Sequence, residues 1–142
     1  MQVKDIMTPD VKCADPETTL QEVAAKMRDL DVGAIPVCGH DDRLQGIVTD
    51  RDIIVRVVAE GLDCRAVRAR DAMTPKVSYC FEDEDIAEAA RKMEQSQIRR
   101  LVVLNRDKRL VGIVSLGDLA VDTGDERLVG EALECISEPA MQ

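Results

Sequence analysis

The chain repeats itself at a spacing of 66 residues. The tripeptide "MTP" at residues 7–9 returns at residues 73–75, and "GIVT" returns as "GIVS" at the same spacing. Aligned without a gap, residues 3–60 and 69–126 share 19 identities in 58 pairs. A solenoid has shorter units, of roughly 20–50 residues, and needs at least three of them. The repeat therefore predicts a duplicated domain with a pseudo-twofold axis, in which each half buries its apolar face against the other.

Each half alternates between a helical and a strand-like pattern. "TLQEVAAKMRDL" has apolar residues at helical spacing, and the β-rich runs "AIPVCG" and "LQGIVT" follow it, separated by a polar turn. A second helix follows, and in the second half it is interrupted by Gly124. We expect a mixed α/β fold with the order lead-in segment, helix, strand, strand, helix. The predicted divisions are motif 1 at residues 1–64, motif 2 at 65–126 and a helical tail at 127–142.

The composition excludes several classes of partner. The net charge of −9 and the presence of only two aromatic residues disfavour nucleic acid, which is bound mainly by Lys and Arg and by aromatic stacking. No apolar run is long enough for a membrane span, and the first residues lack the apolar region of a signal peptide. We expect a cytoplasmic protein with neither a nucleic-acid nor a membrane partner.

The end of the second strand carries the chemistry that suggests a ligand. Thr49 and Ser115 place a hydroxyl at the start of a helix, where free N–H groups favour a phosphate. Three residues later, Asp52 and Asp118 place a carboxylate that can accept hydrogen bonds from the vicinal hydroxyls of a ribose. Together they suggest a nucleotide. A helix cap with an acidic first turn explains the same residues, and duplication by descent would preserve caps too.

Several motifs in the same order resemble one known family. "GIVTDRD" and "GIVSLGD" are similar to the Gly-h-h-Thr/Ser-x-x-Asp motif of cystathionine β-synthase (CBS) domains. "DIMTPDV" and "DAMTPKV" resemble the lead-in segment of that family, and "VGAIPV" and "IRRLVV" its second strand. The resemblance covers residues 3 to about 126. It implies tandem CBS domains, each β-α-β-β-α, that form a Bateman module, and the chain resembles the stand-alone hypoxic-response type.

The resemblance also implies two nucleotide sites, in which the hydroxyl contacts phosphate, the Asp binds ribose and the base lies between the lead-in segment and the second strand. Site 1 would comprise Val11, Lys12, Cys13, Ala34, Ile35, Pro36, Thr49, Arg51 and Asp52. Site 2 would comprise Val77, Ser78, Tyr79, Arg100, Leu101, Val102, Ser115 and Asp118. In the alignment of the two halves, Ala34 corresponds to Arg100 and Arg51 corresponds to Gly117. These are the largest differences between the sites, so we expect the two sites to bind the nucleotide with unequal affinities.

The five cysteines are scattered and form no CxxC pair, which disfavours a zinc knuckle. If the segments that contain Cys13 and Cys38 pair as they do in this family, their thiols come within disulfide range, about 4–7 Å between Cα atoms. A metal site built on these cysteines and His40 would lack an obvious fourth ligand, so no metal site is predicted.

The leading interpretation is a non-catalytic regulatory module that binds an adenine nucleotide (AMP, ADP or ATP) in the cleft between its two CBS motifs. NAD and S-adenosylmethionine are alternative ligands. The resemblance implies a homodimer, a disc of four CBS motifs, and an effector protein that acts in trans. The rival interpretation is a redox-linked interaction scaffold with vestigial nucleotide sites and a Cys13–Cys38 disulfide. An enzyme is not expected, because no set of nucleophile, base and orienting residue is visible.

Overall fold

The chain forms two compact units that do not follow the order of the repeat. The computed structural model describes residues 1–138. One unit is Lys12–Val77, and the other combines Met1–Val11 with the chain from Ser78 onward. The sequence motifs at 1–64 and 65–126 thus contribute their lead-in segments to different units from their helices. Residues 139–142 of the predicted tail lie outside the described residues.

The unit Lys12–Val77 contains a β-hairpin and its helices. Strands β2 and β3 pair antiparallel, with Ala34 opposite Thr49. Ala14 forms a parallel bridge to Val37, and Thr74 forms an antiparallel bridge to Ile47, so a chain segment flanks each edge of the hairpin. The elements are α1 (Leu20–Leu30), β2 (Ala34–Cys38), a 3-10 turn η2 (His40–Asp42), β3 (Leu44–Thr49), α2 (Asp50–Ile53), a π-helical continuation η3 (Ile54–Val58) and α3 (Ala69–Ala72).

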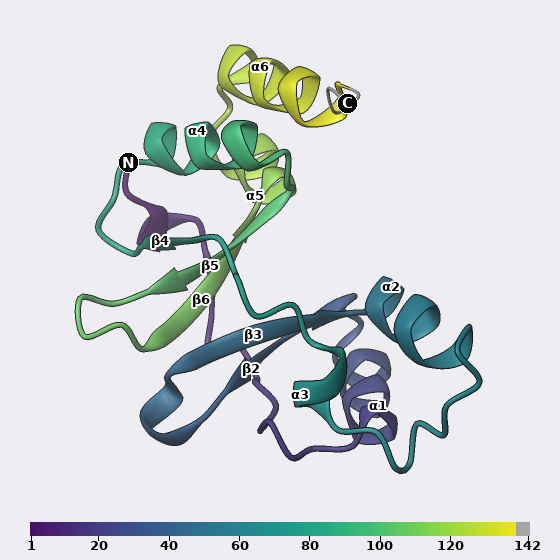
Figure 1. Ribbon diagram of the computed structural model, residues 1–142. Helices are drawn as coiled ribbons and strands as arrows, with labels where there is room; N and C mark the ends of the chain where they lie inside the picture. Colours follow the sequence, from purple (N-terminus) through teal and green to yellow (C-terminus); the bar gives the residue numbers. More distant parts are fainter. Residues whose placement is uncertain (139–142) are drawn as a thin grey trace. The chain divides into compact units, whose positions relative to one another are not determined.

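The other unit repeats this plan with a full four-stranded sheet. The strand order is β1-β6-β5-β4, with β4 parallel to β5 and the other two pairs antiparallel. Helices α4, α5 and α6 lie together on one side of this sheet (Figure 1). The elements are a 3-10 turn η1 (Val3–Asp5), β1 (Thr8–Pro9), β4 (Tyr79–Phe81), α4 (Ile86–Ser96), β5 (Arg100–Leu104), β6 (Leu110–Ser115), α5 (Leu116–Asp122) and α6 (Glu126–Ser137).

Alternate strand residues build the core of each unit. In β5, Leu101 and Val103 are almost fully buried and pack against Met93 of α4. In the other unit, Ile35 and Val37 of β2 are equally buried and pack against Met27 of α1. Because side chains alternate between the two faces of a strand, the residues between them lie on the opposite face. The mixed α/β fold, with the order β-α-β-β-α, is therefore confirmed in its local structure. Within residues 1–138, no helix is long and apolar enough to cross a membrane.

Each lead-in segment lies directly against a glycine of the second hairpin strand. A Cβ on Gly112 would lie 2.7 Å from the carbonyl oxygen of Thr8 and 2.8 Å from the Met7 sulfur. A Cβ on Gly46 would meet Thr74 and Met73 in the same way, at 2.8 and 2.7 Å. Such distances are far below van der Waals contact with backbone atoms. The glycines are therefore required by the close approach of the "MT" segments.

Replacing Gly112 with Ala should consequently destabilise the protein by about 1–3 kcal/mol, because the added methyl overpacks the contact with β1. Urea unfolding followed by circular dichroism measures this free energy. Gly130→Ala is the matched control, since nothing lies within 4 Å of its Cβ position in α6. That variant should gain up to about 1 kcal/mol of helix propensity. Equal stability of the Gly112→Ala variant and the wild type would contradict the close approach.

Candidate ligand-binding site

The two strand-to-helix junctions have the same hydrogen bonds. Thr49 ends β3, and its hydroxyl oxygen accepts from the Asp52 backbone N–H at 3.1 Å, while the Asp52 carboxylate accepts from the Thr49 N–H at 2.9 Å. Ser115 and Asp118 repeat these bonds at 3.1 and 2.8 Å. Each junction is thus a reciprocal capping box. The helix-cap interpretation of these residues therefore holds in both copies.

Capping leaves part of each side chain available. A hydroxyl that accepts one hydrogen bond still has its own proton to donate, and a carboxylate that accepts through Oδ2 keeps Oδ1. A phosphate oxygen can accept from such a hydroxyl, and a sugar hydroxyl can donate to such a carboxylate. The capping role and a ligand-binding role are chemically compatible at both junctions.

The strand register places the predicted site residues on two different faces. Ala34 lies opposite Thr49, and Arg100 lies opposite Ser115, so these pairs share the face opposite the core clusters, where Ala34 is buried and Arg100 is exposed. Ile35 and Leu101 lie on the other face, each 1% exposed within a core cluster. Only the backbone groups of Ile35 and Leu101 could therefore contact a ligand on the outer face.

The remaining predicted residues of both sites are placed as follows. Tyr79 lies opposite Val102, on the same face as Arg100. In the other unit, Pro36 shares the outer face with Ala34, and the exposed Lys12 and the half-buried Cys13 precede the bridging residue Ala14. Val11 and Val77 each belong to a different unit from the rest of their predicted site. Ser78 is the first residue of the second segment of its unit. Arg51 is exposed in α2.

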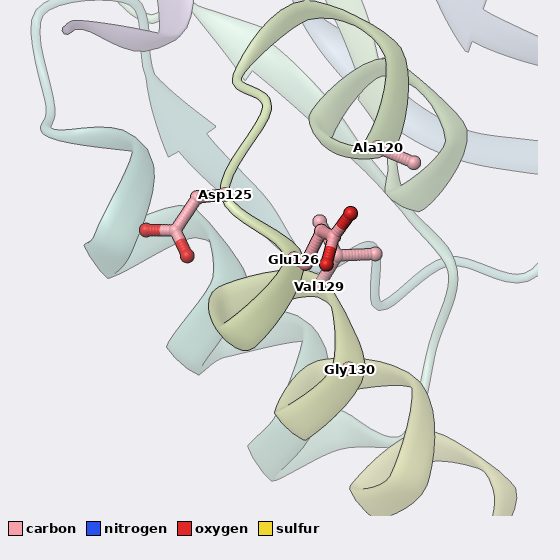
Figure 2. Close-up of a pocket in the computed structure, with 5 residues that line it drawn as sticks. All are labelled: Ala120, Asp125, Glu126, Val129 and Gly130. Atoms are coloured by element: carbon pink, nitrogen blue, oxygen red, sulfur yellow. The ribbon is translucent and has the colours of Figure 1, made fainter.

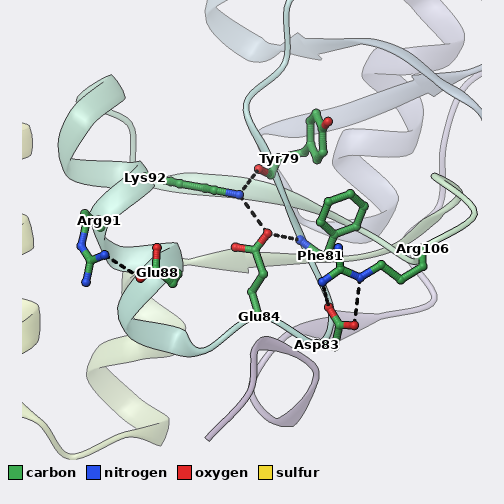
Figure 3. A network of polar contacts seen from close by, with 8 residues as sticks. All are labelled: Tyr79, Phe81, Asp83, Glu84, Glu88, Arg91, Lys92 and Arg106. Atoms are coloured by element: carbon green, nitrogen blue, oxygen red, sulfur yellow. Dashed lines mark hydrogen bonds and ion pairs between the residues drawn. The ribbon is translucent and has the colours of Figure 1, made fainter.

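A lysine that the motif-based prediction missed holds the same segment in each unit. Lys26 donates to the Cys13 carbonyl at 3.2 Å, and Lys92 donates to the Tyr79 carbonyl at 3.3 Å. Lys92 also pairs with Glu84 at 3.0 Å (Figure 3). The two lysines are identical in the repeat, and this identity was the signal that could have found them. They fix the backbone next to the predicted base-binding residues.

The carboxylates of the two junctions have different electrostatic neighbours. Arg56 Nε lies 3.9 Å from Asp52 Oδ1, and the same guanidinium donates to the carbonyls of Ala72 and Met73. The residue equivalent to Arg56 is Asp122, one turn after Asp118. Asp118 has no ion pair within residues 1–138. The free carboxylate oxygen is therefore partly neutralised at one junction only.

The two cysteines of the predicted pair lie close in space and are not bridged. Ala14 donates to the Pro36 carbonyl, and Cys38 donates to the Ala14 carbonyl, which aligns Cys13 with the end of β2. Burial, together with the charge and hydrogen bond of the neighbouring Cys13, raises the pKa of the Cys38 thiol to about 12. Both residues are free thiols. Cys38 is therefore protonated at neutral pH.

Two further features bear on cofactors. The part of the chain that the structure describes has no group of three His, Cys, Asp or Glu residues that could hold a metal ion. A shallow pocket of about 250 Å³ lies between α5 and α6 (Figure 2), and Ser115 is not among its lining residues. It is lined by Ala120, Asp125, Glu126, Val129 and Gly130. Its two carboxylates and small apolar floor offer no cation for a phosphate.

Comparison with known proteins agrees with this arrangement. The CBS domain family model matches residues 3–59 and again residues 69–122. Hypoxic response protein 1 of Mycobacterium tuberculosis is 41% identical over 117 residues, which are 82% of this chain and 81% of that protein. The chain belongs to the CBS domain family and carries two copies of the domain.

Solved structures show the same fold. A crystal structure of Hypoxic Response Protein I with two coordinated zinc ions matches with a TM-score of 0.79 and 39% identity, over 86% of this chain and 98% of that one. A CBS domain protein from Pyrobaculum aerophilum complexed with AMP matches with a TM-score of 0.77 and 26% identity, over 94% and 99% of the two chains. The fold is therefore that of paired CBS domains.

Proposed function

We propose that the protein is a non-catalytic regulatory module that binds adenine nucleotides of the AMP, ADP and ATP class and signals to a partner in trans. The observation that carries the proposal is the duplicated junction, in which a hydroxyl proton and a carboxylate oxygen remain available after the helix is capped. The AMP complex of the Pyrobaculum aerophilum relative supports the choice of ligand. NAD and S-adenosylmethionine share the adenosine group and are tested alongside.

Isothermal titration calorimetry of AMP, ADP, ATP, NAD and S-adenosylmethionine tests this function. Asp118→Ala and Asp52→Ala should each raise the Kd of one site about tenfold or more, because the ribose loses its acceptor. Asp85→Ala is the matched control, since Asp85 caps α4 through the Ala87 N–H at 2.9 Å and lies outside both predicted sites. The proposal fails if no ligand binds the wild type below about 1 mM.

The same proposal includes a homodimer formed through helices. Three apolar side chains on the helix that follows Thr49 are exposed: Ile54 at 58%, Val55 at 45% and Val58 at 59%. An apolar face of this kind is typical of a protein–protein contact. A second copy, with the same face, can cover it.

Ile54→Glu should therefore convert the dimer to a monomer, because the dimer would bury an unpaired carboxylate. Size-exclusion chromatography with light scattering measures the mass. Asp107→Ala, in the turn between β5 and β6, is the control and should leave the mass unchanged. A dimeric Ile54→Glu variant would show that the contact lies elsewhere.

A redox function is the second candidate, and the proximity of the Cys13 and Cys38 thiols favours it. On oxidation, the two thiols would lose two protons and two electrons to form a disulfide. Thiolate is the attacking species, and the raised pKa of Cys38 makes that thiol a poor thiolate source at neutral pH, so oxidation should quicken as the pH rises.

Treatment with diamide, a thiol oxidant, followed by non-reducing peptide mass spectrometry tests this function. We expect a cross-linked Cys13–Cys38 peptide, with Cys64 and Cys135 as internal controls that stay unlinked to either. Cys38→Ser should abolish the product. If Cys13 and Cys38 stay reduced at a diamide concentration that oxidises Cys64 or Cys135, the redox function is wrong.

A further inference from the structure

The outer face of the sheet that contains β4, β5 and β6 combines two groups that the repeat does not duplicate. Tyr79 lies opposite Val102, and Arg100 lies two residues before Val102 on the same strand face. Arg100 is in turn opposite Ser115. An aromatic ring, a guanidinium and the junction hydroxyl thus share one face of a single compact unit.

The ring of Tyr79 is held in place by neighbouring side chains, and the residue is partly exposed to solvent. It packs edge-to-face against Phe81, with ring centroids 5.7 Å apart and planes at 85°. The Lys92 ammonium lies 6.0 Å from its centroid and donates to its backbone carbonyl (Figure 3). The residue is 37% exposed. A fixed, accessible ring is a stacking platform for a nucleobase, and every base can use it.

Phe81 is fixed in turn, which makes the platform rigid. The Arg106 guanidinium lies 4.2 Å from the Phe81 ring centroid and pairs with Asp83 through two bonds of 2.7 and 2.9 Å (Figure 3). Arg106 is therefore already engaged, and its charge is balanced by Asp83. A rigid ring loses little conformational entropy when a base stacks on it.

Arg100 is suited to the phosphate end of the same ligand. Its side chain is exposed at the start of β5, and it has no ion-pair partner among residues 1–138. Two residues of rise span roughly 6.6 Å and neighbouring strands lie about 4.8 Å apart, so the Cα atoms of Arg100 and Tyr79 are separated by roughly 8 Å, and both side chains start from the same sheet face. Ser115, opposite Arg100, adds its hydroxyl at the phosphate end.

The equivalent face of the other unit has neither group. Cys13 takes the place of Tyr79, and Ala34 takes the place of Arg100 opposite Thr49. At that junction the carboxylate of Asp52 is paired with Arg56. The cations available there, Lys12 and Arg51, lie outside the strands.

We propose that site 2 is the high-affinity nucleotide site and that Tyr79 and Arg100 determine this preference, Tyr79 by stacking on the base and Arg100 by binding the phosphate. This inference rests on the proposed function. Site 1 retains the hydroxyl and the carboxylate but binds the same nucleotide more weakly. The module therefore fills its two sites in sequence as the nucleotide concentration rises.

The chain offers a direct probe, because Tyr79 is its single tyrosine and it has no tryptophan. Titration of the full chain with AMP should change the tyrosine fluorescence in step with the tighter of two calorimetric events. Asp118→Ala should raise the Kd of that event about tenfold or more, and Asp52→Ala should leave it unchanged. Ribose 5-phosphate, which lacks a base, should bind without the fluorescence change that AMP produces.

Substitutions separate the two contacts. Tyr79→Cys should weaken both AMP and adenosine at site 2, roughly tenfold or more, while Tyr79→Phe retains the ring and the affinity. Arg100→Ala should weaken AMP severalfold and leave adenosine unchanged, because adenosine lacks the phosphate that Arg100 contacts. The reverse exchange, Cys13→Tyr in an Asp118→Ala background, should tighten AMP binding at site 1.

Three results would overturn the inference. If AMP binds but the tyrosine fluorescence does not change and Asp52→Ala removes the tighter event, site 1 is the stronger site, and the proposed function still stands. If the two sites bind AMP equally in the wild type, the preference does not exist, and the function again stands. If none of the adenosine ligands binds below about 1 mM, the proposed function fails, and this inference fails with it.

Discussion

The contact between each "MT" segment and a glycine of the second hairpin strand is the constraint on which the two units depend. At Gly112 and Gly46, the backbone and the methionine sulfur come so close that no side chain fits between them. The contact adds a neighbour to the exposed edge of β6 or β3, an edge that would otherwise be left with unpaired backbone groups. Two of the most strongly repeated motifs, "MTP" and "GIV", are therefore the two sides of one interaction.

The sequence predicted local structure well because that structure depends on local patterns. Helical spacing located α1 and α4, and β-rich runs separated by a polar turn located the hairpins. The exchange of lead-in segments could not be predicted in the same way. Both "MTP" copies are identical and both glycines accept them, so nothing in the neighbouring residues says which copy contacts which glycine. The π-helical turn Ile54–Val58 likewise has no pattern that distinguishes it from an α-helix.

The capping geometry of the two junctions could be predicted from the sequence, but the direction of the strand side chains was predicted less well. Thr49 and Asp52 have sequence neighbours that define their geometry, since a capping box is a local motif. Ile35 and Leu101 were included with the strands that contain them, although alternation places them in the core. Lys26 and Lys92 contact the site segments from a helix 13 residues away in the chain, a relation that depends on the fold.

Duplication separates the residues that build the scaffold from those that we propose choose a ligand. The glycine, the lysine and the capping aspartate are identical in both copies because each performs the same packing or hydrogen-bonding task in each unit. The outer-face residues Tyr79 and Arg100 do not perform these shared tasks, and they differ from the aligned residues Cys13 and Ala34. A ligand shifts a conformational equilibrium only by its differential affinity for the two states. Under the proposed function, two sites with a common scaffold and different outer faces respond to different concentrations of one ligand, which two identical, independent sites could not do.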